Sequence, residues 1–231
     1  PVHVDADVSQ ESYLHSPRYG IKLLDDFLGS NTTNNQIGEL GWGMSTTGTA
    51  ATFNNGSGEA SRPSAVNLDT GTTATGRCEI NLDINGIVLG GGEIYETAID
   101  ITTLSDATNE FDIRVGLCDN NTGDCTDGVY FLYDRNTSVN WIRSTADNSV
   151  RTQTVSSTAV STGWVWLQFV VANDLSSVEF FVNNVSIGAN TTNIPNQAVD
   201  ATGLMFQIIK SAGTASRDFD IDYVTFYQHN T

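Results

Sequence analysis

Residues 164–188 read WVWLQFVVANDLSSVEFFVNNVSIG, and their pattern indicates the fold class most clearly. Apolar side chains fill Trp164–Ala172, which predicts the most apolar strand of a sheet, in a central position. The runs Val178–Val182 and Val185–Ile187 flank Asn183-Asn184, and two such residues between apolar runs are typical of a hairpin turn. Consecutive strands joined by tight turns indicate an antiparallel sheet.

The same alternation of apolar and polar residues recurs through the rest of the chain. Asn85-Gly86 predicts a second hairpin, and no long stretch repeats at helical spacing. We therefore predict an all-β, antiparallel two-sheet jelly-roll sandwich over residues 31–231, behind an extended N-terminal arm over residues 1–30. The further predicted strands are Cys78–Ile84, Glu93–Ile101, Phe111–Cys118, Gly128–Tyr133, Val139–Arg143, Arg151–Thr158, Leu204–Ile209 and Phe219–Tyr227.

The charge of the chain excludes two classes of partner. Its 231 residues carry a formal net charge of -17, which repels the phosphates of nucleic acids and anionic membrane surfaces. No apolar run approaches the roughly 18 residues that span a bilayer. The first twenty residues are polar, so we expect no signal peptide there.

The position of the histidines argues against two kinds of catalysis. The three histidines are His3, His15 and His229, so residues 16–228 contain none. A Ser-His-Asp or Cys-His group needs imidazole inside the folded body, and catalytic zinc sites usually use two or three histidines. The chemistry that remains is catalysis by a carboxylate pair, or calcium binding by oxygen ligands.

Several segments resemble a known fold family. The pattern Trp164-x-Trp-Leu-x-Phe-Val-Val, the segments Ser177–Asn184 and Ile187-Gly188, and the final run Asp220–Gln228 resemble the paired strands of concanavalin A-like lectin/glucanase domains. The resemblance implies a jelly roll over roughly residues 27–228. It does not imply one function, because this fold hosts lectins, hydrolases, lyases and structural modules.

A narrower resemblance implies a role. Six segments are similar to uncharacterised structural proteins of tailed bacteriophages, and they cover residues 69–77, 89–92, 103–105, 127–131, 193–195 and 208–217. This resemblance implies a non-enzymatic virion-surface protein of the capsid decoration or fibre type, made in the host cytoplasm. The arm would bind other virion proteins, and the virion analogy favours a symmetric homo-oligomer, with a trimer as the first expectation.

A second hypothesis is a lectin-like module that binds cell-surface glycans. Its site would combine an exposed aromatic ring with polar neighbours. Trp141 and Asn140 are the candidates, because their strand is short and amphipathic. Trp164 and Trp166 share one face of their strand and are expected in the core.

The loop after residue 118 suggests a metal site and a disulfide. Asp119, Asn121, Asp124 and Asp127 offer oxygen ligands at close spacing, with glycine between them, which suits calcium. The alternative is an acidic hairpin tip that uses these residues for turn geometry. Cys118 and Cys125 bracket the loop, and they either form a disulfide or stay reduced.

A glycan hydrolase or lyase is the third hypothesis, and we expect no enzyme. Glu93 and Glu96 differ by three positions and would point to opposite faces of a strand. Glu96 and Asp100 share a face but lie about 13 Å apart, too far for a retaining pair. A lyase site built from Tyr130, Tyr133 and Arg135 competes with simple packing of these side chains.

Overall fold

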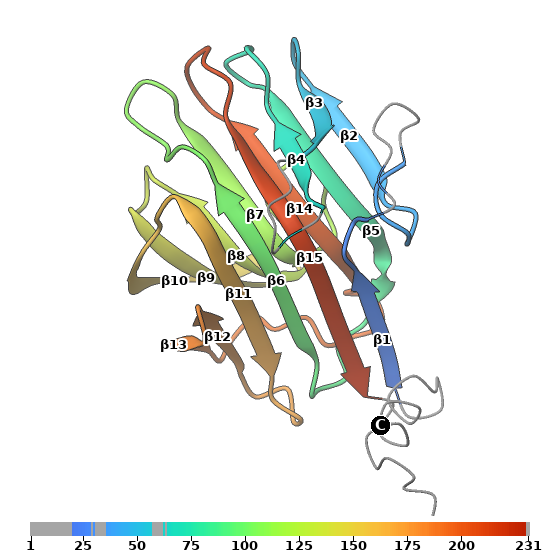
Figure 1. The fold of residues 1–231 in the computed structure, drawn as a ribbon. Helices are drawn as coiled ribbons and strands as arrows, with labels where there is room; N and C mark the ends of the chain where they lie inside the picture. The colour runs from blue at the N-terminus through green and yellow to red at the C-terminus, as the bar shows by residue number, and fades with distance from the viewer. Residues whose placement is uncertain (1–19, 29, 31–35, 57–61, 63, 230–231) are drawn as a thin grey trace, which may run out of the picture.

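The chain is an all-β jelly-roll sandwich of two antiparallel sheets (Figure 1). The computed structural model describes residues 20–28, 30, 36–56, 62 and 64–229. An eight-stranded sheet has the order β13-β12-β11-β6-β15-β4-β3, with β1 also pairing with β15. Its strands are β1 (Gly20–Asp25), β3 (Thr52–Asn55), β4 (Val66–Asp69), β6 (Ile94–Ile101), β11 (Gly163–Val171), β12 (Val178–Val182), β13 (Val185–Asn190) and β15 (Asp218–His229).

A seven-stranded sheet packs against the first and has the order β10-β9-β8-β7-β14-β5-β2. Every strand predicted from residue 93 onward is present in one of the two sheets. Among the described residues, no helix is long and apolar enough to cross a membrane. The strands of this sheet are β2 (Gly43–Thr47), β5 (Arg77–Ile87), β7 (Phe111–Cys118), β8 (Gly128–Asp134), β9 (Asn140–Asp147), β10 (Val150–Ala159) and β14 (Thr202–Lys210).

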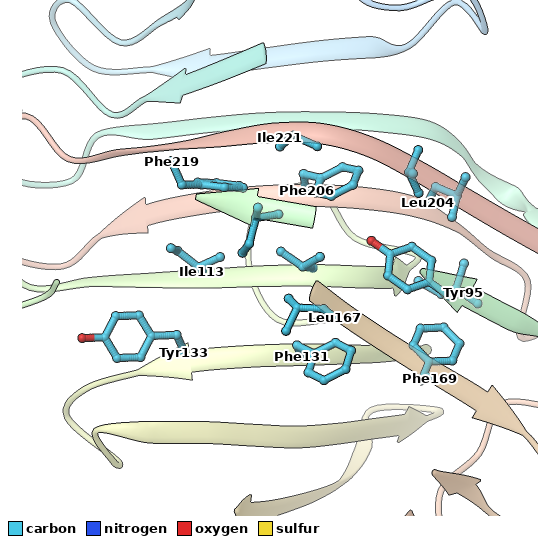
Figure 2. Packing of buried hydrophobic residues seen from close by; sticks show 14 of the residues in the cluster. Tyr95, Ile113, Phe131, Tyr133, Leu167, Phe169, Leu204, Phe206, Phe219 and Ile221 are labelled. Atoms are coloured by element: carbon cyan, nitrogen blue, oxygen red, sulfur yellow. The ribbon is translucent and has the colours of Figure 1, made fainter. Parts of the chain in front are cut away.

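The main core lies between the two sheets (Figure 2). Phe131 of β8 meets Phe180 of β12 edge to face, with ring centroids 5.1 Å apart, and so joins the sheets. Tyr95 stacks on Phe169 at 4.9 Å. Burial of each such side chain contributes roughly 1.5–3 kcal/mol, and an aromatic pair adds about 0.5–1.5 kcal/mol. Because these side chains point inward, alternate residues of the same strands point outward.

The sandwich begins earlier in the chain than the sequence predicts. Strand β1 starts at Gly20 and pairs along its length with β15, so the predicted boundary after residue 30 is wrong. Asp25 ends this strand with a buried carboxylate, which accepts hydrogen bonds from the backbone of Phe27 and Glu39 and from Nε1 of Trp42. These bonds attach β1 to the following turn. The rest of the predicted arm, residues 1–19 and 29, lies outside the described residues.

The two predicted hairpin turns have different outcomes. Asn183 and Asn184 join β12 to β13 with φ values of 50° and 62°, which confirms that turn. The hairpin predicted at Asn85-Gly86 is wrong, because β5 continues to Ile87. The register of β5 with β14 shifts before Ile87, so the Asn-Gly pair belongs to a strand irregularity.

Candidate functional site

The candidate site is the outward face of the eight-stranded sheet around Trp164 and Trp166. Both side chains belong to β11, where Val165 and Leu167 between and beside them are buried in the core. Alternation along the strand therefore turns both indole rings outward. Trp166 keeps 39% of its surface exposed, and Trp164 is half-buried. The expectation that both rings lie in the core is wrong.

Arg62 lies over both rings. Its guanidinium carbon is 4.4 Å from the ring centroid of Trp164 and 4.9 Å from that of Trp166. Its Nε lies 3.0 Å from Oδ2 of Asp222 on β15. A cation over an aromatic face contributes about 0.5–2 kcal/mol, more when it is desolvated. The ion pair and the ring contacts together fix the position of the two tryptophans.

Polar groups continue this face toward β6 and β15. Tyr223 donates a hydrogen bond from its hydroxyl to Oε1 of Glu96, and Gln168 donates from Nε2 to Oε2 of Glu96 at 3.0 Å. Burial, followed by the nearby carboxylate of Glu96, raises the pKa of Tyr223 above its usual range. Burial also raises the pKa of Asp222, against the opposing effect of Arg62. The face therefore offers phenol and amide groups beside carboxylate acceptors.

The residues predicted to bind a sugar are not available for that role. Trp141 is 1% exposed and packs in the core against Phe131 and Tyr133. No sugar can stack on a ring enclosed in this way, so the prediction for Trp141 is wrong. Asn140 is half-buried, and its side-chain amide donates to the backbone carbonyl of Ser156. It holds β9 to β10.

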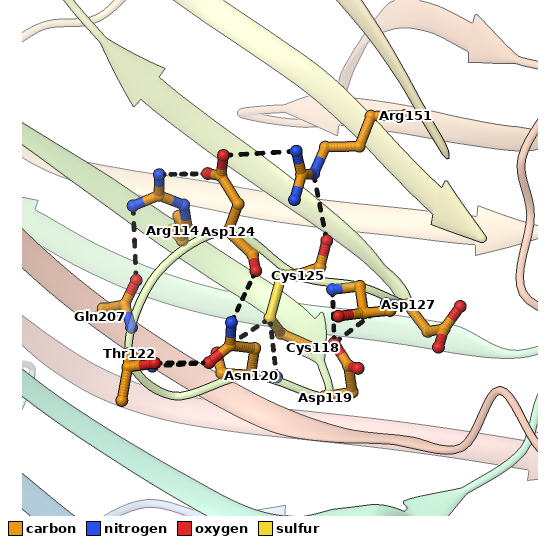
Figure 3. The surroundings of a disulfide bond; sticks show 11 residues. Arg114, Cys118, Asp119, Asn120, Thr122, Asp124, Cys125, Asp127, Arg151 and Gln207 are labelled. Atoms are coloured by element: carbon orange, nitrogen blue, oxygen red, sulfur yellow. Dashed lines mark hydrogen bonds and ion pairs between the residues drawn. A yellow bond between two sulfur atoms is a disulfide. The ribbon is translucent and has the colours of Figure 1, made fainter. Parts of the chain in front are cut away.

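The structure joins Cys118 and Cys125 by a disulfide, and the loop between them lies on the seven-stranded sheet (Figure 3). Asp124 forms ion pairs with Arg114 at 2.6 Å and with Arg151 at 3.4 Å. Asp119 accepts hydrogen bonds from the backbone of Thr126 and Asp127. Both carboxylates therefore serve the loop itself.

Of the carboxylates predicted to bind calcium, Asp127 belongs to a cluster of three carboxylates in the described residues. Asp127 lies beside Asp147 and Asp200, and one carboxylate oxygen of each falls within 4.8 Å of the others. Asp119, Asn121 and Asp124 are not part of this group. Burial, with nearby carboxylates, raises the pKa of Asp127. Three such carboxylates could hold a metal ion.

Three of the residues considered for catalysis are buried and make their contacts inside the fold. Glu93 is buried, and its carboxylate accepts hydrogen bonds from the backbone of Gly90 and Gly91. Tyr130 and Tyr133 are buried as well, Tyr133 against Phe111. None of these three side chains opens onto a surface where a polymer could bind.

Comparison with known proteins gives a family and a fold. The model of a family described as "SO2946-like, C-terminal domain" matches residues 61–222. No curated protein sequence matches the chain. The crystal structure of SO2946 from Shewanella oneidensis MR-1, a protein of unknown function, is similar with a TM-score of 0.65 and 15% identity, over 99% of this chain and 95% of that one.

Two further solved structures have names that refer to carbohydrates. The carbohydrate esterase vb_24B_21 from Shiga toxin-encoding bacteriophage phi24B has a TM-score of 0.56 and 17% identity, over 91% of this chain and 100% of that one. The carbohydrate recognition domain of Emp47p has a TM-score of 0.58 and 11% identity, over 92% and 98%. The shared architecture is the concanavalin A-like lectin and glucanase fold, as the resemblance implied.

Proposed function

The chain belongs to the family described as SO2946-like, C-terminal domain, and on that premise we propose that it is a non-enzymatic carbohydrate-binding module. The lectin-like sandwich supplies the scaffold, and the outward face of the eight-stranded sheet supplies the site. The observation that carries the proposal is the pair of tryptophans on β11, held outward beneath Arg62.

The chemistry of this face suits a sugar. A pyranose has an apolar face that packs on an aromatic ring, and hydroxyls that need hydrogen-bond partners. Trp166 is the exposed ring, and Glu96 and Asp222 are acceptors on the neighbouring strands.

The absence of histidine between residues 16 and 228 supports binding without turnover. The carboxylates of the face act in interactions of their own: Glu96 with Tyr223 and Gln168, and Asp222 with Arg62. Such groups hold the site in shape. We therefore assign no general acid or base.

The test is binding of the purified full chain to an immobilised glycan array, compared with Trp166→Ala. We expect the variant to lose most of the signal, because a sugar that stacks on the indole ring loses that contact when the ring is removed. Val155→Ala removes another exposed apolar side chain, from β10 on the other sheet, and serves as the control. Absence of binding by the wild-type chain across the array would refute the function.

A second candidate function is display on the surface of a bacteriophage particle, where a glycan site would contact the host. The similarity to the full length of a bacteriophage carbohydrate esterase structure favours it. In this proposal the segment before β1 attaches the sandwich to other virion proteins. The chain forms a symmetric homo-oligomer, with a trimer as the first expectation.

Deletion tests this attachment. Because β1 and Asp25 belong to the sandwich, the deletion must stop at residue 19. We expect the shortened chain to fold and to be missing from purified particles. Incorporation at the wild-type level would remove the proposed role of the segment. Light scattering of the full chain measures the oligomer.

A further inference from the structure

One row of outward side chains crosses five neighbouring strands of the eight-stranded sheet. The strand register places Asn54 opposite Asn67, Asn67 opposite Asp220, Asp220 opposite Asp100, and Asp100 opposite Trp164. Residues opposite each other on neighbouring strands share a face of the sheet. The row therefore runs across the strands, from a polar end on β3 and β4 to an aromatic end on β11.

The polar end of this row opens into a pocket of about 250 Å³. Nδ2 of Asn67 donates hydrogen bonds to Asp218 at 2.8 Å and to Asp220 at 2.6 Å. Thr102 donates from its hydroxyl to the other oxygen of Asp218 at 2.7 Å. The lining is thus held in place before a ligand arrives, and each carboxylate oxygen can accept more than one hydrogen bond. Asn54, Asn55 and Gly56 complete the pocket.

The spacing of the row sets the size of a ligand that uses both ends. Trp164 and Asp220 are two strands apart, which is about 10 Å, and Asn67 lies about 5 Å further along the row. A single sugar ring that stacks beside Trp164 cannot also reach Asn67. A ligand that contacts both ends must be an oligosaccharide that lies across the strands.

The charge of the face sets the chemistry of the ligand. Asp100, Asp218 and Asp220 lie along or beside the row, while the guanidinium of Arg62 is already paired with Asp222. Hydroxyl groups can donate to such carboxylates. A carboxylate or sulfate on the ligand would meet like charges instead, on a chain whose net charge is -17.

We propose that the pocket lined by Asn67, Asp218 and Asp220 is a second subsite, and that the ligand is a neutral oligosaccharide bound across the strands from the pocket to Trp164. The proposal rests on the carbohydrate-binding function given above. It adds a minimum length and excludes acidic glycans. The two ends differ in role, because the exposed ring of Trp166 beside Trp164 supplies stacking while the pocket selects hydroxyl groups.

Calorimetry of the full chain tests this with defined probes: cellotetraose, laminaritetraose and mannotetraose, each with its monosaccharide, and tetragalacturonate as the acidic probe. We expect at least one neutral tetrasaccharide to bind at least tenfold more tightly than its monosaccharide, and tetragalacturonate to give no measurable binding. Asp218→Asn should lower the affinity for that tetrasaccharide about fivefold. Asp134→Asn, on the opposite sheet, removes the same charge as a control.

The outcomes separate the two levels of the proposal. Equal affinity for monosaccharide and tetrasaccharide would overturn the second subsite, and so would binding of tetragalacturonate as tight as that of the neutral probes. In either case, binding that is lost in Trp166→Ala would still support the carbohydrate-binding function. An unchanged affinity in Asp218→Asn would overturn the pocket alone. Absence of binding to every probe would overturn both.

Discussion

The outward faces of the two sheets are built alike and covered differently. On the seven-stranded sheet, a second apolar cluster forms beneath the disulfide loop and buries Tyr130, Leu132, Ile142 and Met205 with the two cysteines. On the eight-stranded sheet, Trp166 keeps 39% of its surface exposed and a polar pocket opens beside it. The comparison shows that the disulfide loop covers part of one outward face, while the other face stays partly exposed around Trp166.

The polar rows on the two faces make the same point. On the seven-stranded sheet, Glu79 lies opposite Gln207, which lies opposite Arg114, and all three are buried. Glu79 Oε2 and Gln207 Nε2 have no hydrogen-bond partner among the described side chains. Buried polar groups without a partner reduce stability. In the corresponding row on the other face, Asp100 and Trp164 are partly exposed, and the buried Asp220 accepts a hydrogen bond from Asn67.

Removal of the disulfide tests the covered face with the largest expected effect. The double variant Cys118→Ala/Cys125→Ala should lower the free energy of unfolding by about 2–3 kcal/mol, because the disulfide closes a short loop and so reduces the conformational entropy of the unfolded chain. Urea unfolding measures this. Glycan affinity should stay unchanged, because the loop lies on the other sheet. A loss of glycan binding in a folded double variant would contradict the assignment of the site.

Glu79 predicts a pH dependence of stability. Burial raises its pKa to about 7, against the weaker opposing effects of Asn81 and Arg77. The folded chain therefore keeps a proton that the unfolded chain releases near its usual pKa of 4.5, so stability falls as pH rises toward and through 7. We expect a loss of about 1 kcal/mol between pH 6 and pH 8.

Glu79→Gln should remove this part of the pH dependence and make the chain more stable than wild type at pH 8. Glu179→Gln changes an exposed carboxylate and is the matched control. Urea unfolding at both pH values gives the comparison. Equal slopes for wild type and Glu79→Gln would show that the carboxyl is not buried in the way the structure places it.

Metal removal should have the smallest effect on glycan binding. Asp127, Asp147 and Asp200 lie at the ends of strands of the seven-stranded sheet, away from Trp166. Addition of EDTA should therefore leave glycan affinity unchanged in calorimetry. Loss of binding with EDTA and its return with calcium would show that a metal ion takes part in glycan binding, so the metal site and the glycan site would not be independent.

The fold was largely predictable because alternation of apolar residues is a local property. Strands such as Phe111–Cys118 and Val178–Val182 have the bounds that alternation predicts. The absence of a hairpin at Asn85-Gly86 was not predictable, because β5 pairs with β14 on both sides of the irregularity and this pairing overrides the turn preference. The strands before residue 70 are only four to six residues long, so their alternation is too short to predict their bounds.

The site was much less predictable, and the tryptophans show why. In β11 both faces begin with apolar residues, and only Gln168 marks the face of Trp164 and Trp166 as the outward one. In β9 the polar residue Arg143 lies on the inward side with Trp141, where it donates a hydrogen bond to the backbone of Ala189. A polar residue usually marks the outward side of a strand, so here the pattern pointed to the wrong face. Neither the position of Arg62 nor the register of five strands can be derived from one sequence.

Calorimetry of Trp166→Ala against wild type, with the tetrasaccharide that wild type binds best, tests whether the outward face of β11 binds sugar. Trp166→Phe keeps a smaller ring and guards against a folding defect, and Val155→Ala is the control on the other sheet. We predict a loss of at least twentyfold for Trp166→Ala, an intermediate loss for Trp166→Phe and none for Val155→Ala. Equal affinity of Trp166→Ala and wild type would show that the sugar does not bind at this ring.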